Sequence, residues 1–219
     1  MVTSRGCQGL AFDLDGTLVN SQPLHLKAWR RIFERYGMRR KITMDSILGV
    51  SVRDFVVSLG FAPTMEATLA QAKTENFLEI MREEPPQLYP GVRETIEFLV
   101  GRIRLSVVTS CQQEIIESLL QHEPRFFSLF EFFITEESCS RTKPDPEPFL
   151  TCLERFCLTA DDVIAVEDSE AGVASARAAG LCVIAVTHTT PRARLTQERT
   201  IVIDNFRELV NIFSQGALL

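Results

Sequence analysis

The chain has 219 residues, of which 45% are hydrophobic and 24% are charged, and its formal net charge is −6. These values are typical of a globular protein with one large domain, or with a core domain that carries a smaller insert. The acidic balance gives no general electrostatic reason to expect nucleic-acid binding. No apolar stretch is as long as a transmembrane helix, and the N-terminus lacks the pattern of a secretory signal. Six scattered cysteines without a Cys-x-x-Cys pair predict reduced thiols in the cytoplasm.

A short apolar run from Gly9 to Phe12 predicts a buried strand that leads directly into Asp13 and Asp15. Since residues two apart in an extended segment point the same way, both carboxylates would project into one small space. Two anions held so close repel each other unless a cation lies between them, and hard oxygen ligands favour magnesium. An ordinary Asp-Gly turn would have the same local sequence, so this motif alone leaves both interpretations open.

The next part of the chain is predicted to be all-helical. Apolar periodicity predicts helices over residues 22–36, about 44–59 with a break near 49–51, and about 65–82. No convincing strand occurs between residues 22 and 84, and the Glu-Glu-Pro-Pro sequence at 83–86 predicts a linker. We therefore expect a helical insert over residues 19–86, which interrupts a core formed by residues 1–18 and 87–219.

From Tyr89 onwards, helices alternate with short apolar strands. The predicted strands cover residues 103–109, 132–134, 163–166, 182–186 and 201–203, and the helices between and after them cover 112–121, 146–156, 171–179 and a last segment to about 213. A further helix of about ten residues is predicted from Pro90-Gly91. This alternation indicates an α/β protein with βαβ units and a parallel sheet, which would also contain the opening strand.

Polar side chains follow four of these segments. Ligands of parallel sheets bind beyond the carboxyl ends of the strands. Thr109 and Ser110 follow the second core strand, Glu167 and Asp168 follow a later one, and Lys143 precedes Pro144 in a loop. We therefore expect carboxylates, hydroxyls and one ammonium to meet at a single edge of the sheet.

This set of side chains suits the binding of a phosphate group. Asp13 would be the nucleophile that takes the phosphoryl group, and Asp15 would protonate the leaving oxygen and then deprotonate the attacking water. Phosphate would be bound by Thr109, Ser110 and Lys143. A magnesium ion would be held by ligands from the acidic set Asp13, Asp15, Glu167 and Asp168.

Four motifs resemble those of the haloacid dehalogenase superfamily, in that family's order and over nearly the whole chain. They are Asp13-Leu-Asp-Gly-Thr17, Val108-Thr-Ser110, Lys143-Pro-Asp-Pro146 and Glu167-Asp-Ser-Glu-Ala-Gly172. The resemblance implies a Rossmann-like core flanked by helices, a small helical cap inserted after the first strand, magnesium and an aspartyl-phosphate intermediate.

The resemblance also separates several activities. Relatives that dehalogenate or cleave phosphonates lack an aspartate at the place of Asp15, so its presence implies a phosphatase or a phosphomutase. Thr17 and Thr109 resemble the sugar-phosphate phosphatases more than β-phosphoglucomutase, which typically has valine and serine there. A non-catalytic metabolite-binding protein on the same fold is a third hypothesis, but it predicts loss of at least one key residue, and Asp13, Asp15, Lys143 and Asp168 are all present.

The expected partner is a small phosphorylated metabolite, a sugar phosphate by resemblance, with no nucleic acid or membrane partner and a monomeric or weakly dimeric state. The cap would supply the contacts beyond the phosphate. His25 matches a cap histidine of β-phosphoglucomutase in spacing, and Arg53 lies one position after the mutase arginine, so both are candidate substrate contacts. Packing and solvent exposure are the alternatives for these two residues. We interpret Cys111 as a bystander thiol and His188 as a loop histidine.

Overall fold

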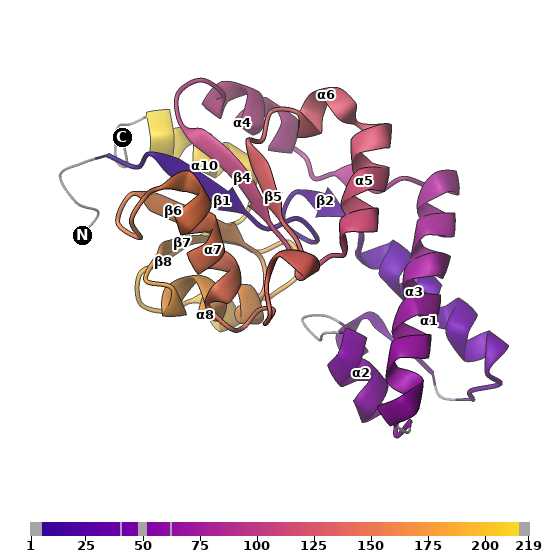
Figure 1. Ribbon diagram of the computed structural model, residues 1–219. Helices are drawn as coiled ribbons and strands as arrows, with labels where there is room; N and C mark the ends of the chain where they lie inside the picture. Colours follow the sequence, from indigo (N-terminus) through magenta and orange to yellow (C-terminus); the bar gives the residue numbers. More distant parts are fainter. Residues whose placement is uncertain (1–5, 40, 48–51, 62, 215–219) are drawn as a thin grey trace. The chain divides into compact units, whose positions relative to one another are not determined.

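The computed structural model describes residues 6–39, 41–47, 52–61 and 63–214. The chain divides into two compact units, Met1–Val19 with Leu88–Leu219, and Asn20–Gln87. The first unit holds the main sheet and the second is the helical segment inserted after β1 (Gly9–Phe12; Figure 1).

In the described part of the chain, six parallel strands form the main sheet, in the order β5-β4-β1-β6-β7-β8. Their bounds are Gly9–Phe12 (β1), Arg104–Val108 (β4), Phe132–Ile134 (β5), Val163–Glu167 (β6), Cys182–Val186 (β7) and Thr200–Ile203 (β8). Because β1 lies between β4 and β6, its carboxyl end is flanked by the ends of both neighbours. This arrangement confirms the predicted α/β class with a parallel, Rossmann-like sheet.

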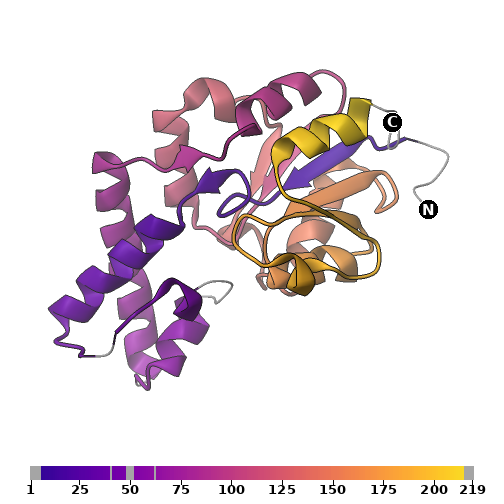
Figure 2. The same cartoon turned by 180° about the vertical axis from the view of Figure 1, so that it is seen from behind.

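Every residue of β1 is buried, as expected for a central strand that helices cover on both faces. Ala11 packs into the cluster formed with Phe149 of α7 (Glu147–Phe156) and Val173 of α8 (Glu170–Ala178). On the opposite face, the ring of Phe12 stacks with Phe206 at 6.3 Å between centroids. Figure 2 shows α10 (Phe206–Ser214) lying alongside β1. Side chains that alternate between the two faces of the strand therefore fill two separate cores.

The helices of this unit join the strands and cover the sheet (Figures 1 and 2). Their bounds are Val92–Leu99 (α4), Gln113–His122 (α5), Pro124–Phe127 (α6), Glu147–Phe156 (α7), Glu170–Ala178 (α8), Arg192–Leu195 (α9) and Phe206–Ser214 (α10), with a 3₁₀ turn at Glu136–Ser138 (η2). Short strands at Val19–Asn20 (β2) and Gln87–Leu88 (β3) pair with each other where the helical segment leaves and rejoins the core.

The inserted unit contains α1 (Gln22–Arg35), the 3₁₀ turn η1 (Met44–Ser46), α2 (Val52–Ser58) and α3 (Pro63–Glu83). Its own core is aromatic, with Trp29 of α1 and Phe55 of α2 in edge-to-face contact at 4.7 Å. Exposed ion pairs, such as Arg31 to Glu79 at 3.3 Å, join α1 to α3. Among the described residues, no helix combines the length and the apolar character needed to cross a bilayer.

The described residues agree with the predicted order of elements, except that residues 44–46, predicted as α-helix, form the 3₁₀ turn η1. The predicted break near 49–51 lies outside the described residues. The structure also adds short elements that periodicity does not detect. The four-residue helices α6 and α9 and the two-residue strands β2 and β3 were not predicted. A single turn or a pair of residues is too short to show a repeating apolar pattern. Cys7 is buried, whereas Cys182 is half-buried because it starts β7.

The first prediction concerns α7, whose Phe156 is 1% exposed in the core beneath the sheet. We expect Phe156→Ala to lower the free energy of unfolding by about 3–5 kcal/mol, because it leaves a cavity that the core cannot fill. Urea denaturation measures the change. Leu150→Ala on the same helix is the matched control, since Leu150 is 43% exposed, and we expect a change within about 0.5 kcal/mol. Equal effects of the two substitutions would contradict this packing.

Candidate active site

The predicted site residues of the core lie where the strands end. Asp13 directly follows β1, Thr109 follows β4, and Glu167 is the last residue of β6. The backbone N–H of Asp13 donates to the carbonyl of Val166 at 2.8 Å, so the parallel pairing continues past the end of β1. This pairing fixes the Asp13 side chain beside Glu167 and Asp168.

The ammonium group of Lys143 joins three of these segments. Its side chain is only 6% exposed, and Nζ donates to Asp13 Oδ1 at 2.7 Å, to Glu167 Oε1 at 2.5 Å and to the carbonyl of Val108 at 2.7 Å. An ammonium has three protons, so these bonds use all of them. Lys143 therefore ties the ends of β1, β4 and β6 to one nitrogen.

Burial and charge oppose each other in this cluster. Burial lowers the pKa of Lys143, but the neighbouring Asp13 and Glu167 raise it more, so the ammonium stays charged. Burial raises the pKa of Asp13 well above its usual value; Lys143 counteracts this, while Glu167 and Asp168 add to it. The protein alone thus holds more negative charge here than one lysine can compensate.

Asp168 accepts a hydroxyl hydrogen bond on each carboxylate oxygen. Thr17 Oγ1 donates to Oδ1 at 2.9 Å, and Thr189 Oγ1 donates to Oδ2. Burial and the charge of Glu167 raise the pKa of Asp168 to about 7, although the two hydroxyls and Lys143 act in the opposite direction. Hydrogen bonds therefore hold both oxygens of Asp168, but the nearby positive charge does not fully compensate its negative charge.

A divalent cation fits this group of side chains. Oxygens of Asp13, Glu167 and Asp168 lie within 4.8 Å of one another, all three residues are buried, and Lys143 is the ammonium that contacts two of them. Three carboxylates against one ammonium leave a deficit that a hard, oxygen-preferring ion such as Mg²⁺ would compensate. Glu167 is also held from its other oxygen, which accepts from Asp168 N and Ser169 Oγ, both at 3.2 Å.

Asp15 lies half-buried beside Cys111, whose Sγ donates to Asp15 Oδ2 at 2.6 Å. The thiol interpreted from the sequence as a bystander is therefore in contact with the predicted acid/base. The loop that carries it is held by Thr109, whose hydroxyl accepts from the Cys111 N–H at 3.0 Å. Ser110, between them, is exposed. Asp15 as a metal ligand, and Thr109 and Ser110 as phosphate ligands, stay predictions.

Two glycines are required by the closeness of the carboxylates. Gly16 has φ +93°, and a Cβ atom there would collide with Asp168 Oδ2 and lie 2.8 Å from Thr189 Cγ2. At Gly172 in α8, a Cβ would overlap the carboxylate of Glu167. The glycine of each acidic motif thus leaves room for the carboxylate of Glu167 or Asp168.

The structure adds residues that sequence reasoning missed. After β7, His188 Nδ1 lies 3.1 Å from the carbonyl oxygen of Gly16, and Thr189 donates to Asp168. The ring of His188 stacks on Tyr89 at 3.8 Å between centroids. Burial lowers the pKa of His188, so its ring is neutral at pH 7. The sequence signal that could have pointed to His188 and Thr189 is their position after β7, because β7 ends at the same edge of the sheet as β1 and β6.

The predicted cap contacts belong to the inserted unit Asn20–Gln87. His25 stacks on Phe77 at 4.2 Å, and the ammonium of Lys73 lies 4.8 Å from the centre of the same ring. Arg53 belongs to α2, but its side chain lies outside what the structure describes. Both residues stay predicted substrate contacts.

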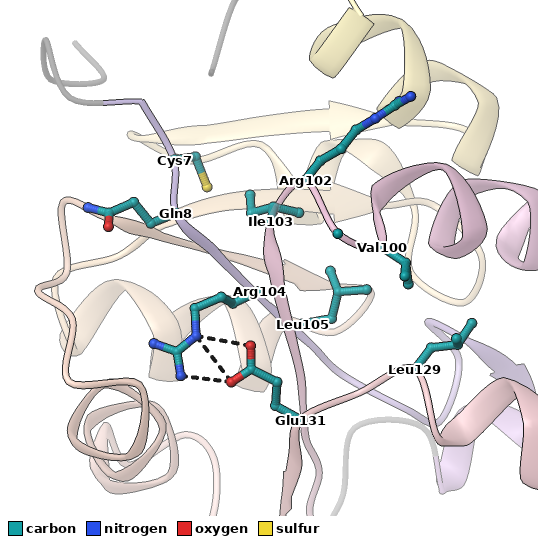
Figure 3. Close-up of a pocket in the computed structure, with 10 residues that line it drawn as sticks. Cys7, Gln8, Val100, Arg102, Ile103, Arg104, Leu105, Leu129 and Glu131 are labelled. Atoms are coloured by element: carbon teal, nitrogen blue, oxygen red, sulfur yellow. Dashed lines mark hydrogen bonds and ion pairs between the residues drawn. The ribbon is translucent and has the colours of Figure 1, made fainter.

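A groove of about 550 Å³ lies at the opposite edge of the sheet, where β1 and β4 begin (Figure 3). Its charged pair is neutralised, since the guanidinium of Arg104 donates to both oxygens of Glu131 at 2.7–3.1 Å. Ile103 and Leu105 line it with apolar surface, and burial raises the pKa of Cys7 to about 12. Because its one carboxylate is paired and its thiol is not ionised, the lining does not suit a metal.

Comparison with known proteins agrees with the geometry of the site. The family of haloacid dehalogenase-like hydrolases matches residues 10–186. The chain is 31% identical over 222 residues to a phosphorylated carbohydrates phosphatase of Thermotoga maritima, covering 95% of this chain and 99% of that one. It is 32% identical over 197 residues to hexitol phosphatase A of Escherichia coli, covering 87% and 88%. The crystal structure of a β-phosphoglucomutase from Clostridium difficile shares the fold, with a TM-score of 0.79, 21% identity and 96% coverage of both chains.

The second prediction tests the buried ammonium. We expect Lys143→Met to lower the free energy of unfolding by about 3–5 kcal/mol, because Asp13 and Glu167 would stay buried without their partner. Urea denaturation at neutral pH provides the measurement. The control is Lys27→Met, which breaks an exposed ion pair with Glu84 and should cost less than about 1 kcal/mol. A Lys143 variant as stable as the control would contradict the proposed role.

The third prediction concerns Asp168 in protein treated with a chelator. Its pKa rises from the ordinary 3.8 to about 7, so the native state favours the protonated form. The stability that this group contributes is fully present below its unfolded pKa and is lost as pH rises through the folded pKa. We expect the free energy of unfolding of the wild type, relative to Asp168→Asn, to fall between about pH 4 and about pH 8. Urea denaturation across this range measures it, and a difference that is constant or rises with pH would be the opposite result.

Proposed function

The chain belongs to the haloacid dehalogenase-like hydrolases and is a phosphatase, and we propose that it hydrolyses a small sugar phosphate through an aspartyl-phosphate intermediate on Asp13. The observation that carries this proposal is the buried cluster at the carboxyl ends of β1 and β6. There a carboxylate bound to an ammonium lies beside two further carboxylates, and the predicted acid/base follows two residues later.

Asp13 is the proposed nucleophile. Its carboxylate directly follows the central strand, and Lys143 holds Oδ1 at 2.7 Å, which fixes the orientation of the group. One Asp13 oxygen attacks phosphorus, and the bond between phosphorus and the sugar oxygen breaks. Asp15 donates its proton to that leaving oxygen. The products of this half-reaction are the free sugar and phosphorylated Asp13.

Hydrolysis of the intermediate uses the same acid/base in its other protonation state. Asp15, now a carboxylate, takes a proton from a water molecule, and the water oxygen attacks phosphorus. The bond between phosphorus and Asp13 breaks, which releases inorganic phosphate and restores both aspartates. The thiol of Cys111 at Asp15 Oδ2 orients the acid/base between the two steps.

The charge of the phosphoryl group must be compensated in this acidic site. Mg²⁺ held by Asp13 and Asp168, with Glu167 beside them, would supply positive charge that favours the anionic nucleophile and neutralises the phosphoryl oxygens. Lys143 adds a fixed ammonium, and the hydroxyl of Thr109 and the backbone N–H of Ser110 would donate to phosphate oxygens. These residues orient the phosphoryl group by direct contact.

The choice of a sugar phosphate rests on the relatives, whose names specify phosphorylated carbohydrates and a hexitol. His25 and Arg53 are the proposed cap contacts to the sugar. The cytoplasmic location and the monomeric or weakly dimeric state also stay predictions. A phosphomutase and a non-catalytic binding protein are the outcomes that the following experiment separates from the phosphatase.

The fourth prediction is that a panel of sugar and sugar-alcohol phosphates, assayed with Mg²⁺, releases inorganic phosphate. We expect Asp13→Asn to lower kcat by at least about 1000-fold, because it removes the nucleophile, and Asp15→Asn to lower it by about 100- to 10,000-fold. Rapid quenching of a ³²P-labelled substrate should trap phosphate on wild-type protein and none on Asp13→Asn.

The matched control is Asp161→Asn, an exposed aspartate that precedes β6 and so lies at the other end of the strand from Glu167, which should leave kcat unchanged. Conversion of the substrate to an isomer without net phosphate release would favour the mutase. No turnover of any compound by protein that binds one of them would favour the binding protein.

A further inference from the structure

The loop that follows β7, with sequence Thr187-His188-Thr189-Thr190, contacts both acidic motifs of the site. His188 reaches the carbonyl oxygen of Gly16, in the turn after β1, and Thr189 reaches the carboxylate of Asp168, after β6. None of the four motifs that identify the family resemblance includes this loop. It is nevertheless in direct contact with two of them.

Thr189 completes the hydrogen bonding of Asp168. Oδ1 is occupied by Thr17 at 2.9 Å and Oδ2 by Thr189, so the two threonines hold the carboxylate from opposite ends. The Thr189 hydroxyl also lies 3.4 Å from the backbone carbonyl of Asp168. Asp168 is 2% exposed, and a buried carboxylate that loses a donor is costly to keep ionised in one orientation.

The loop itself is held by aromatic contacts. The His188 ring lies between Tyr89, at 3.8 Å and 20° between ring planes, and Phe206, at 5.9 Å and 21°. Its Nδ1 is 3.1 Å from the Gly16 carbonyl oxygen. Since His188 is the neighbour of Thr189, these contacts restrict where the Thr189 hydroxyl can lie. The carboxylate of Asp168 is thus oriented by a part of the chain that is itself fixed.

We propose that this loop is a further component of the phosphatase site, in which Thr189 is a positioning residue that holds Asp168 in the orientation that binds Mg²⁺. The inference rests on the proposed function. Groups that hydrogen-bond a metal ligand from behind typically change metal affinity by about 10- to 100-fold when removed. Thr189 itself would touch neither metal nor substrate.

The fifth prediction compares Mg²⁺ binding by wild-type protein and Thr189→Val, measured by isothermal titration calorimetry without substrate. Valine keeps the shape of threonine but cannot donate to Asp168, so we expect the Kd for Mg²⁺ to rise about 10- to 100-fold. Thr189→Ser restores a hydroxyl and should return the Kd to within about threefold of the wild type. In assays, we expect Thr189→Val to need more Mg²⁺ for half-maximal activity while kcat at saturating Mg²⁺ stays close to wild type.

Thr187→Val is the matched control, because its hydroxyl also makes a hydrogen bond from this loop, but to the exposed Asp204 at 2.8 Å. It should bind Mg²⁺ like the wild type. Thermal unfolding in a chelator checks that each variant folds, and Thr189→Ala replaces Thr189→Val if the latter does not.

Two failures are distinguishable. This inference alone would be overturned if a folded variant without the Thr189 hydroxyl bound Mg²⁺ as tightly as the wild type. It would also be overturned if Thr187→Val weakened Mg²⁺ binding as much as Thr189→Val. Wild-type protein that releases phosphate without binding Mg²⁺ would overturn the proposed metal dependence, and this inference with it.

Discussion

The structure of the site depends on one buried ammonium. Lys143 donates its three protons to Asp13, to Glu167 and to the carbonyl of Val108, and so joins the ends of three neighbouring strands. A cation in this position is stable only because two carboxylates face it, and those carboxylates are stable in the core only because of the cation. The parallel sheet makes this mutual dependence achievable, since it brings the ends of β1, β4 and β6 to one edge.

The close packing of the carboxylates also explains why glycines lie beside the cluster. The carboxylates of Glu167 and Asp168 occupy space that a side chain at Gly172 or Gly16 would fill. At Gly16 the backbone also adopts a φ of +93°, which glycine enters without strain. The glycines of the two acidic motifs therefore have a packing reason as well as a conformational one: they let an acidic side chain from one strand end approach the backbone of another segment.

The order of elements and the core of the site could be predicted from the sequence because each signal is local. Apolar runs specify the strands, and carboxylates that follow β1 and β6 must meet if those strands are parallel neighbours. The contacts of Thr189 and Cys111 could not be predicted this way. Threonine and cysteine are common in loops, and their partners lie 21 and 96 residues away, so only the folded backbone brings them together. The stacking of His25 on Phe77 in the helical unit is non-local for the same reason.

Charge balance explains why an acidic protein can act on an anionic substrate. The chain carries a net charge of −6, and the site concentrates carboxylates around one ammonium, so the protein by itself repels phosphate at this edge. In the proposed function a divalent cation would reverse that local field, because the same carboxylates that repel phosphate would attract the metal that binds it. The hydroxyls of Thr17 and Thr189 fix the orientation of Asp168 by hydrogen bonds. Because they carry no charge, they do not neutralise the carboxylate that would bind the cation. In the proposed function, the excess of acid at the strand ends would therefore make phosphate binding depend on the metal, and the orientation of Asp168 would affect the affinity of the whole site.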